Sequence, residues 1–145
     1  MNHTEDFKTR NKKNIAENKC KQYLKDNNIL FTRYGFDCLF DIKKEKFNLV
    51  PEVLRPTPDF MVFQSNAILL EAKGCKEVLR VKQCDMKGYD WWAKIIPLTM
   101  FLYSTIYRAH KIIPYKKLRN IAVKCETDIY HDNNKVYYKI PWELI

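Results

Sequence analysis

Two carboxylates and one amine lie close together in the sequence, between Asp59 and Lys73. Pro58-Asp59 is followed by Glu71-Ala72-Lys73. Carboxylate oxygens are hard ligands of the kind that Mg²⁺ and Mn²⁺ prefer, and a bound divalent ion acidifies water and balances charge on an attacked phosphate. A neighbouring lysine can orient that water or stabilise the negative charge. These residue types therefore indicate metal-dependent hydrolysis of a phosphodiester bond.

Two short apolar runs flank a polar turn and predict the hairpin that would position this set. Residues 60–63 read Phe-Met-Val-Phe, and residues 68–70 read Ile-Leu-Leu. Apolar runs of this length predict buried strands, and Gln64-Ser65-Asn66 between them is typical of a turn. The segment from 60 to 73 is therefore predicted to be an antiparallel hairpin.

The spacing of the charged residues decides which loop the hairpin must have. Side chains alternate along a strand, so Glu71 and Lys73 share one face. Asp59 reaches that face opposite Glu71 only if the loop has an odd number of residues. A three-residue loop centred on Ser65, with Asn66 in a left-handed conformation, meets this condition. The alternative is a surface hairpin whose charged side chains are solvated. The position of these charges at the ends of two apolar strands favours the metal site.

Composition favours a single globular domain with a polyanionic partner. The chain has 145 residues, 46% of them hydrophobic, and a formal net charge of +9. Such a charge favours nucleic acid, with an anionic membrane surface as the rival. No apolar run approaches membrane-spanning length, and no signal peptide opens the chain. We predict one domain over residues 14–145, preceded by a flexible basic arm, residues 1–13, that ends in Arg10-Asn11-Lys12-Lys13.

The cysteines indicate a reducing compartment. Five cysteines are scattered along the chain without a Cys-x-x-Cys pair. This pattern predicts free thiols and a cytoplasmic protein, and it gives no support to a structural zinc site.

The remaining periodicity predicts an α/β fold with a mixed sheet. Helices are expected at 14–26, at 78–94 with an interruption at Gly88, and at 114–120. Besides the hairpin, strands are expected at 29–34, 36–42, 98–103 and 136–140, and 43–57 is expected to be a long loop. Tyr89, Trp91 and Trp92 either stack on nucleic-acid bases or anchor the predicted helix in the core or a dimer interface.

The sequence resembles the PD-(D/E)xK nucleases, and within them the phage endonuclease I family of Holliday junction resolvases. Thr57-Pro58-Asp59-Phe60 and Glu71-Ala72-Lys73-Gly74 are the most specific matches. Weaker matches are Asn14-Ile15-Ala16-Glu17-Asn18-Lys19-Cys20, Ile29-Leu30-Phe31 and Ile140-Pro141-Trp142-Glu143. The resemblance implies a restriction-endonuclease-like core, in which a mixed central β-sheet is flanked by helices. It also implies a homodimer and a phage protein that acts in the host cytoplasm.

The resemblance assigns roles to five residues. Asp59, Glu71 and the backbone carbonyl of Ala72 would bind one Mg²⁺ or Mn²⁺ ion. Glu17, on the first helix, and Asp59 would flank a second ion, and Lys73 would lie beside the attacking water. The expected catalytic set is therefore Glu17, Asp59, Glu71 and Lys73.

The expected substrate is DNA, and the expected activity is a magnesium-dependent endonuclease that resolves Holliday junctions or other branched DNA. Basic residues before and after the site are candidates for phosphate contacts: Lys12, Lys13, Lys76, Arg80, Lys82 and Lys87. One alternative is a less structure-selective phage nuclease that cuts linear or single-stranded DNA. The other is a DNA-binding module without catalytic activity, whose carboxylates are structural.

Overall fold

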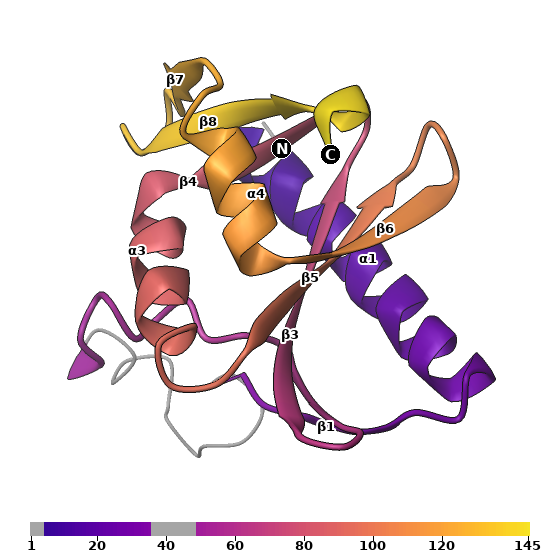
Figure 1. Cartoon of the computed structure of the whole chain (residues 1–145). Coiled ribbons are helices and arrows are strands. Elements are labelled where there is room, and N and C mark those ends of the chain that lie inside the picture. Colours follow the sequence, from indigo (N-terminus) through magenta and orange to yellow (C-terminus); the bar gives the residue numbers. More distant parts are fainter. Residues whose placement is uncertain (1–4, 36–48) are drawn as a thin grey trace.

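The computed structural model describes the backbone of residues 5–35 and 49–145, and the side chains of residues 14–35 and 49–145 (Figure 1). The helices are α1 (Glu5–Asp26), α3 (Gln83–Trp92), α4 (Tyr115–Ala122) and the short 3-10 helix η2 (Trp142–Leu144). The strands are β1 (Leu30–Arg33), β2 (Phe60–Phe63), β3 (Ala67–Cys75), β4 (Val78–Lys82), β5 (Leu98–Ser104), β6 (Ala109–Pro114), β7 (Thr127–Ile129) and β8 (Val136–Pro141). The strand expected at 36–42 and the start of the loop expected at 43–57 lie outside the described residues.

The strands form two sheets. The central sheet has five strands in the order β1-β2-β3-β5-β6. β3 and β5 run parallel, whereas the other neighbours in this sheet are antiparallel. A smaller antiparallel sheet has the order β4-β8-β7. The predicted α/β class with a mixed central sheet flanked by helices is confirmed.

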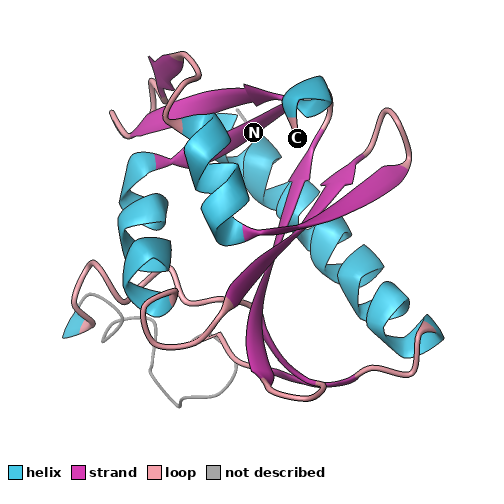
Figure 2. Ribbon diagram, viewed as in Figure 1, coloured by secondary structure: helices cyan, strands magenta, loops and turns pink. Residues whose placement is uncertain are grey.

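Helices cover the central sheet on both faces (Figure 2). On one face α1 contributes Ala16, Cys20 and Leu24, which the helical spacing of the sequence brings to one side. They pack against Phe60, Leu70, Phe101 and other apolar residues of the sheet. On the other face α3, α4 and the small sheet enclose a second cluster that includes Leu69, Met100 and Leu102. β3 is thus buried on both faces, as expected of a central strand with a parallel neighbour.

The register of the hairpin confirms the predicted loop length. Phe60 pairs with Leu70, and Phe63 pairs with Ala67, so residues 64–66 form a three-residue loop. The expected left-handed conformation of Asn66 is wrong. In the part of the chain that the structure describes, non-glycine residues with positive φ are Asn28, Arg108 and Asn134. The Gln64 amide donates instead to the Asn66 carbonyl at 3.2 Å, which closes the loop without a left-handed residue.

The helix expected at 78–94 is wrong in its first part. Residues 78–82 form strand β4, and the helix α3 begins only at Gln83. Val78, Arg80 and Lys82 are exposed or half-buried, whereas Leu79 and Val81 are buried, which is the alternation of a strand with one covered face. β4 forms because β8 supplies its hydrogen-bonding partner. Gly88 does not interrupt α3.

Other boundaries also differ from those expected. The helix α1 begins at Glu5 rather than Asn14, so the backbone of residues 5–13, expected to be an arm, is helical. β6 and β7, which lie at the edges of the two sheets, were not predicted from the sequence. Strands β1, β5 and β8 and helix α4 lie where expected. None of the helices in the described ranges is long and apolar enough to span a membrane.

Candidate active site

Strand β3 brings Glu71 and Lys73 to the same face of the central sheet, while Ala72 faces α1. Ala72 belongs to the core beneath α1, together with Cys20 and Leu70. Glu71 is fully buried, and the side chain of Lys73 is only 12% exposed. A buried carboxylate is costly unless charges and hydrogen bonds compensate it. The contacts that compensate the Glu71 carboxylate therefore define the candidate site.

Asp59 lies where the pairing between β2 and β3 ends. The last pair in the register is Phe60 with Leu70, and Asp59 comes directly before it. The Ala72 amide donates a hydrogen bond of 2.9 Å to Asp59 Oδ2, so the carboxylate takes over from the backbone as the partner of β3. The Tyr34 amide donates to the Asp59 carbonyl, also at 2.9 Å. Asp59 is thus held between β1 and β3, one residue beyond the pair of Phe60 and Leu70. The shared face of the Asp59 and Glu71 side chains stays a prediction.

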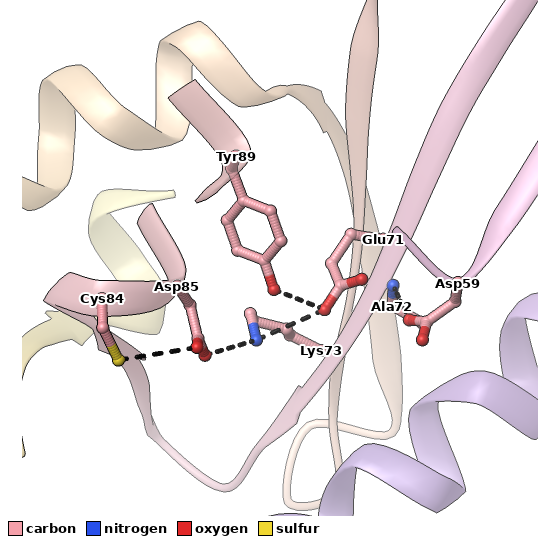
Figure 3. Close-up of polar contacts among 7 residues, drawn as sticks. All are labelled: Asp59, Glu71, Ala72, Lys73, Cys84, Asp85 and Tyr89. Carbon is pink, nitrogen blue, oxygen red and sulfur yellow. Dashed lines mark hydrogen bonds and ion pairs between the residues drawn. The ribbon is translucent and has the colours of Figure 1, made fainter. Parts of the chain in front are cut away.

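Helix α3 completes the environment of Glu71 (Figure 3). The Tyr89 hydroxyl donates to Glu71 Oε1 at 2.6 Å, and Lys73 Nζ lies 3.4 Å from the same oxygen. Lys73 Nζ is also 3.7 Å from Asp85 Oδ2 and 5.3 Å from the centre of the Tyr89 ring. Burial raises the pKa of the Tyr89 hydroxyl well above its usual value, and the charge of Glu71 adds to this effect. Tyr89 is therefore a hydrogen-bond donor at ordinary pH.

Asp85 and Tyr89 were not predicted as residues of the site. They are four residues apart, so they lie on the same side of α3 and contact Lys73 and Glu71 together. The Asp-x-x-x-Tyr spacing in a helix after the Glu-x-Lys strand is the signal that could have indicated them. The buried Tyr89 and Trp92 belong to the core, which confirms the anchoring role considered for them, while Trp91 is 38% exposed.

Glu17 forms an ion pair with Arg33, a residue that was not expected at the site. Arg33 Nη1 donates to Glu17 Oε2 at 2.9 Å, and the two side chains are 24% and 17% exposed. Arg33 is the last residue of β1 and pairs in register with Phe60, the neighbour of Asp59. Its guanidinium carbon lies 5.1 Å from the centre of the Phe60 ring. The ion pair therefore lies next to Asp59, on the side of the sheet that α1 covers.

The Cys20 thiol of α1 lies in a negatively charged part of the molecule. Burial raises its pKa to about 12, with further upward contributions from the charges of Asp59, Glu17 and Glu71 in that order. Arg33 acts in the opposite direction. Because such effects fall off with distance, all four charged groups must lie near this thiol. The fold thus brings Glu17 on α1, Asp59 directly before β2 and Glu71 on β3 into one region of the molecule.

The oxygen atoms of Asp59, Glu71 and Ala72 are the candidates for binding a magnesium-type ion. Among the described residues, no group of three or more His, Cys, Asp or Glu side chains is close enough to hold a metal ion together. Mg²⁺ needs no such group, because it is commonly bound through one or two carboxylates and keeps several waters. Asp59, Glu71 and the carbonyl oxygen of Ala72 supply that kind of oxygen set at the end of the hairpin.

The basic residues expected to contact DNA have different surroundings. Arg80 and Lys82 share the outer face of β4, where Arg80 lies 5.2 Å from the Tyr137 ring and Lys82 lies 5.4 Å from the Tyr130 ring. Lys82 directly precedes α3, which carries Asp85. Lys76, between β3 and β4, and Lys87, on α3, are exposed. The side chains of Lys12 and Lys13 lie outside the described residues.

A scan against models of known protein families finds no match to this chain, and a search of curated proteins finds none either. Any conclusion on function therefore depends on the geometry of the site and on the motifs of the sequence.

Proposed function

We propose that the protein is a magnesium-dependent DNA endonuclease with a restriction-endonuclease-like fold. The observation that carries this proposal is the contact of Lys73 with the buried Glu71, beside Asp59, at the end of the predicted hairpin. A solvated surface hairpin would leave these charges exposed. Their burial is costly, and sites that accept this cost are often functional.

Each residue of the set has a role that follows from its surroundings. Asp59, Glu71 and the Ala72 carbonyl would hold the ion, which, when bound, acidifies a water and balances charge on the phosphate. Lys73 is held within reach of Glu71 and Asp85, and its ammonium group orients the attacking water or stabilises the negative charge of the transition state. Tyr89 keeps the Glu71 carboxylate in place through its hydroxyl.

The favoured substrate is branched DNA, in particular a Holliday junction. The +9 net charge favours a nucleic acid, and the motifs around Asp59 and Glu71 resemble those of the phage junction resolvases. Arg80 and Lys82, on the strand that joins the site to α3, are suited to phosphate contacts near the cut. A homodimer follows from the same resemblance, since paired cuts in a two-fold symmetric junction need two sites.

A cleavage assay tests this function. The purified protein is incubated with a four-way junction, a linear duplex and single-stranded DNA, in Mg²⁺, Mn²⁺, Ca²⁺ or excess EDTA. We expect cleavage of the junction with Mg²⁺ or Mn²⁺, and much weaker turnover with Ca²⁺, whose larger radius and looser geometry suit water activation poorly. Asp59→Asn, purified in parallel, is the control for contaminating nucleases and should be inactive.

The same assay separates the alternatives. Equal cleavage of duplex or single strands would identify a less selective nuclease. DNA binding without cleavage in any metal would leave a non-catalytic binding module, and undiminished cleavage in EDTA would rule out metal-dependent chemistry.

A further inference from the structure

We propose, on the basis of the nuclease function above, that Arg33 binds the substrate phosphate beside a single divalent ion, and that Glu17 positions Arg33 instead of binding metal. The resemblance alone would make Glu17 a ligand of a second ion. In the structure, Glu17 is a partner of the guanidinium of Arg33, at 2.9 Å and in a partly buried setting. This ion pair uses one oxygen of the Glu17 carboxylate and offsets the negative charge that would attract a second ion.

The position of Arg33 is fixed by the backbone next to the proposed metal ligands. Arg33 pairs with Phe60 in the register of β1 and β2, and the next residue, Tyr34, donates its amide to the Asp59 carbonyl. The guanidinium lies over the Phe60 ring, which restricts its freedom further. A planar guanidinium whose orientation is set by packing and by a carboxylate is well suited to a phosphate group.

The balance of charge in the cluster agrees with one ion. Glu17 pairs with Arg33, Lys73 pairs with Glu71 and Asp85, and Asp59 accepts from the amide of Ala72 between Glu71 and Lys73. Counted as formal charges, these four carboxylates and two cations leave two negative charges, which one divalent ion would balance. A second divalent ion would leave two positive charges in excess, and the single negative charge of a phosphodiester could offset only one of them. The Arg33 guanidinium thus takes the place beside Glu17 that a second ion would occupy.

The decisive experiment is calorimetric titration of the full-length protein with Mn²⁺, in wild type and in Glu17→Gln. We expect one ion per chain in both proteins, with dissociation constants within about twofold. Glu17→Gln keeps the shape of the side chain at a partly exposed position, so folding should be preserved. Two ions in wild type, or loss of the ion in Glu17→Gln, would overturn the inference and leave the proposed nuclease function intact. If wild type binds no Mn²⁺, the proposed function fails, and this inference fails with it.

A second measurement tests Arg33 without relying on catalysis. Binding of a four-way junction is measured in Ca²⁺ at several salt concentrations for Arg33→Ala and Arg33→Lys. Arg119→Ala is the matched control, because Arg119, on α4, also pairs with a carboxylate, that of Asp90 on α3. Arg33→Ala should weaken binding and lower the slope of log K against log salt by about one, as loss of a phosphate contact does. Arg33→Lys should keep the slope.

A merely structural role for Arg33 would leave this slope unchanged. An Arg33→Ala slope equal to that of Arg119→Ala would therefore show that Arg33 does not contact phosphate, and would refute the inference.

Discussion

The contact between Lys73 and Glu71 can be measured as a free energy of unfolding. Lys73 Nζ lies 3.4 Å from Glu71 Oε1, Glu71 is fully buried and Lys73 is 12% exposed. At an effective dielectric constant of about 20, two unit charges at this distance interact by about 5 kcal/mol. Asp85 and Tyr89 share the interaction, so we expect a coupling energy of about 2–3 kcal/mol, below the cost of about 3–5 kcal/mol for removing one partner of a buried pair.

A double-mutant cycle with Lys73→Met and Glu71→Gln isolates this coupling. Lys73→Met should lower the free energy of unfolding by about 3 kcal/mol, because it leaves a buried carboxylate without its cation. Glu71→Gln should cost less, since Tyr89 can still donate to the amide oxygen and Lys73 keeps Asp85. In the Glu71→Gln background, Lys73→Met should cost less than about 1 kcal/mol, because no buried charge is then left unpaired.

The measurement is urea unfolding at neutral pH in EDTA, so that bound metal does not contribute. The pair between Lys139 and Glu126 is the matched control, at 3.7 Å with side chains 41% and 86% exposed. A cycle on that surface pair should give a coupling below about 0.5 kcal/mol. If Lys73→Met costs the same in both backgrounds, the electrostatic account of the site is wrong. Cleavage should be lost in Lys73→Met by two or more orders of magnitude, about 3 kcal/mol of transition-state stabilisation.

Two further predictions concern stability. In Gly88→Ala, the new Cβ would lie 2.4 Å from Pro56 Cγ and 2.8 Å from the Val53 carbonyl oxygen. We therefore expect the free energy of unfolding, measured in urea, to fall by about 1–3 kcal/mol, although alanine has the better helix propensity. A stabilised variant would contradict this packing. The Cys20 pKa is raised to about 12, so the native state keeps a proton that the unfolded thiol loses above pH 9. The difference in unfolding free energy between wild type and Cys20→Ala should therefore be constant below pH 9, and the stability of wild type should fall by about 1.4 kcal/mol per pH unit relative to the variant between pH 9 and 12. A difference that does not depend on pH would refute this.

Local patterns in the sequence were enough to predict the α/β class and the hairpin that carries the candidate site residues. Alternation along 67–73 and the parity of the loop put Asp59, Glu71 and Lys73 on one face, and the register of β2 and β3 confirms the odd loop. Helical spacing likewise brings Ala16 and Cys20 to the buried side of α1. These features depend on residues that are close in sequence, and their geometry is set by the period of a strand or a helix.

Tertiary structure alone decided the partners of those residues. Residues 78–82 form a strand only because β8, far along the chain, pairs with them, and the local sequence does not specify that pairing. Arg33 meets Glu17 because α1 packs across the sheet beside β1, and Tyr89 meets Glu71 because α3 packs over β3. A carboxylate's partner depends on which elements dock against it, so the sequence shows that Glu17 is charged, and only the folded chain shows that an arginine neutralises it.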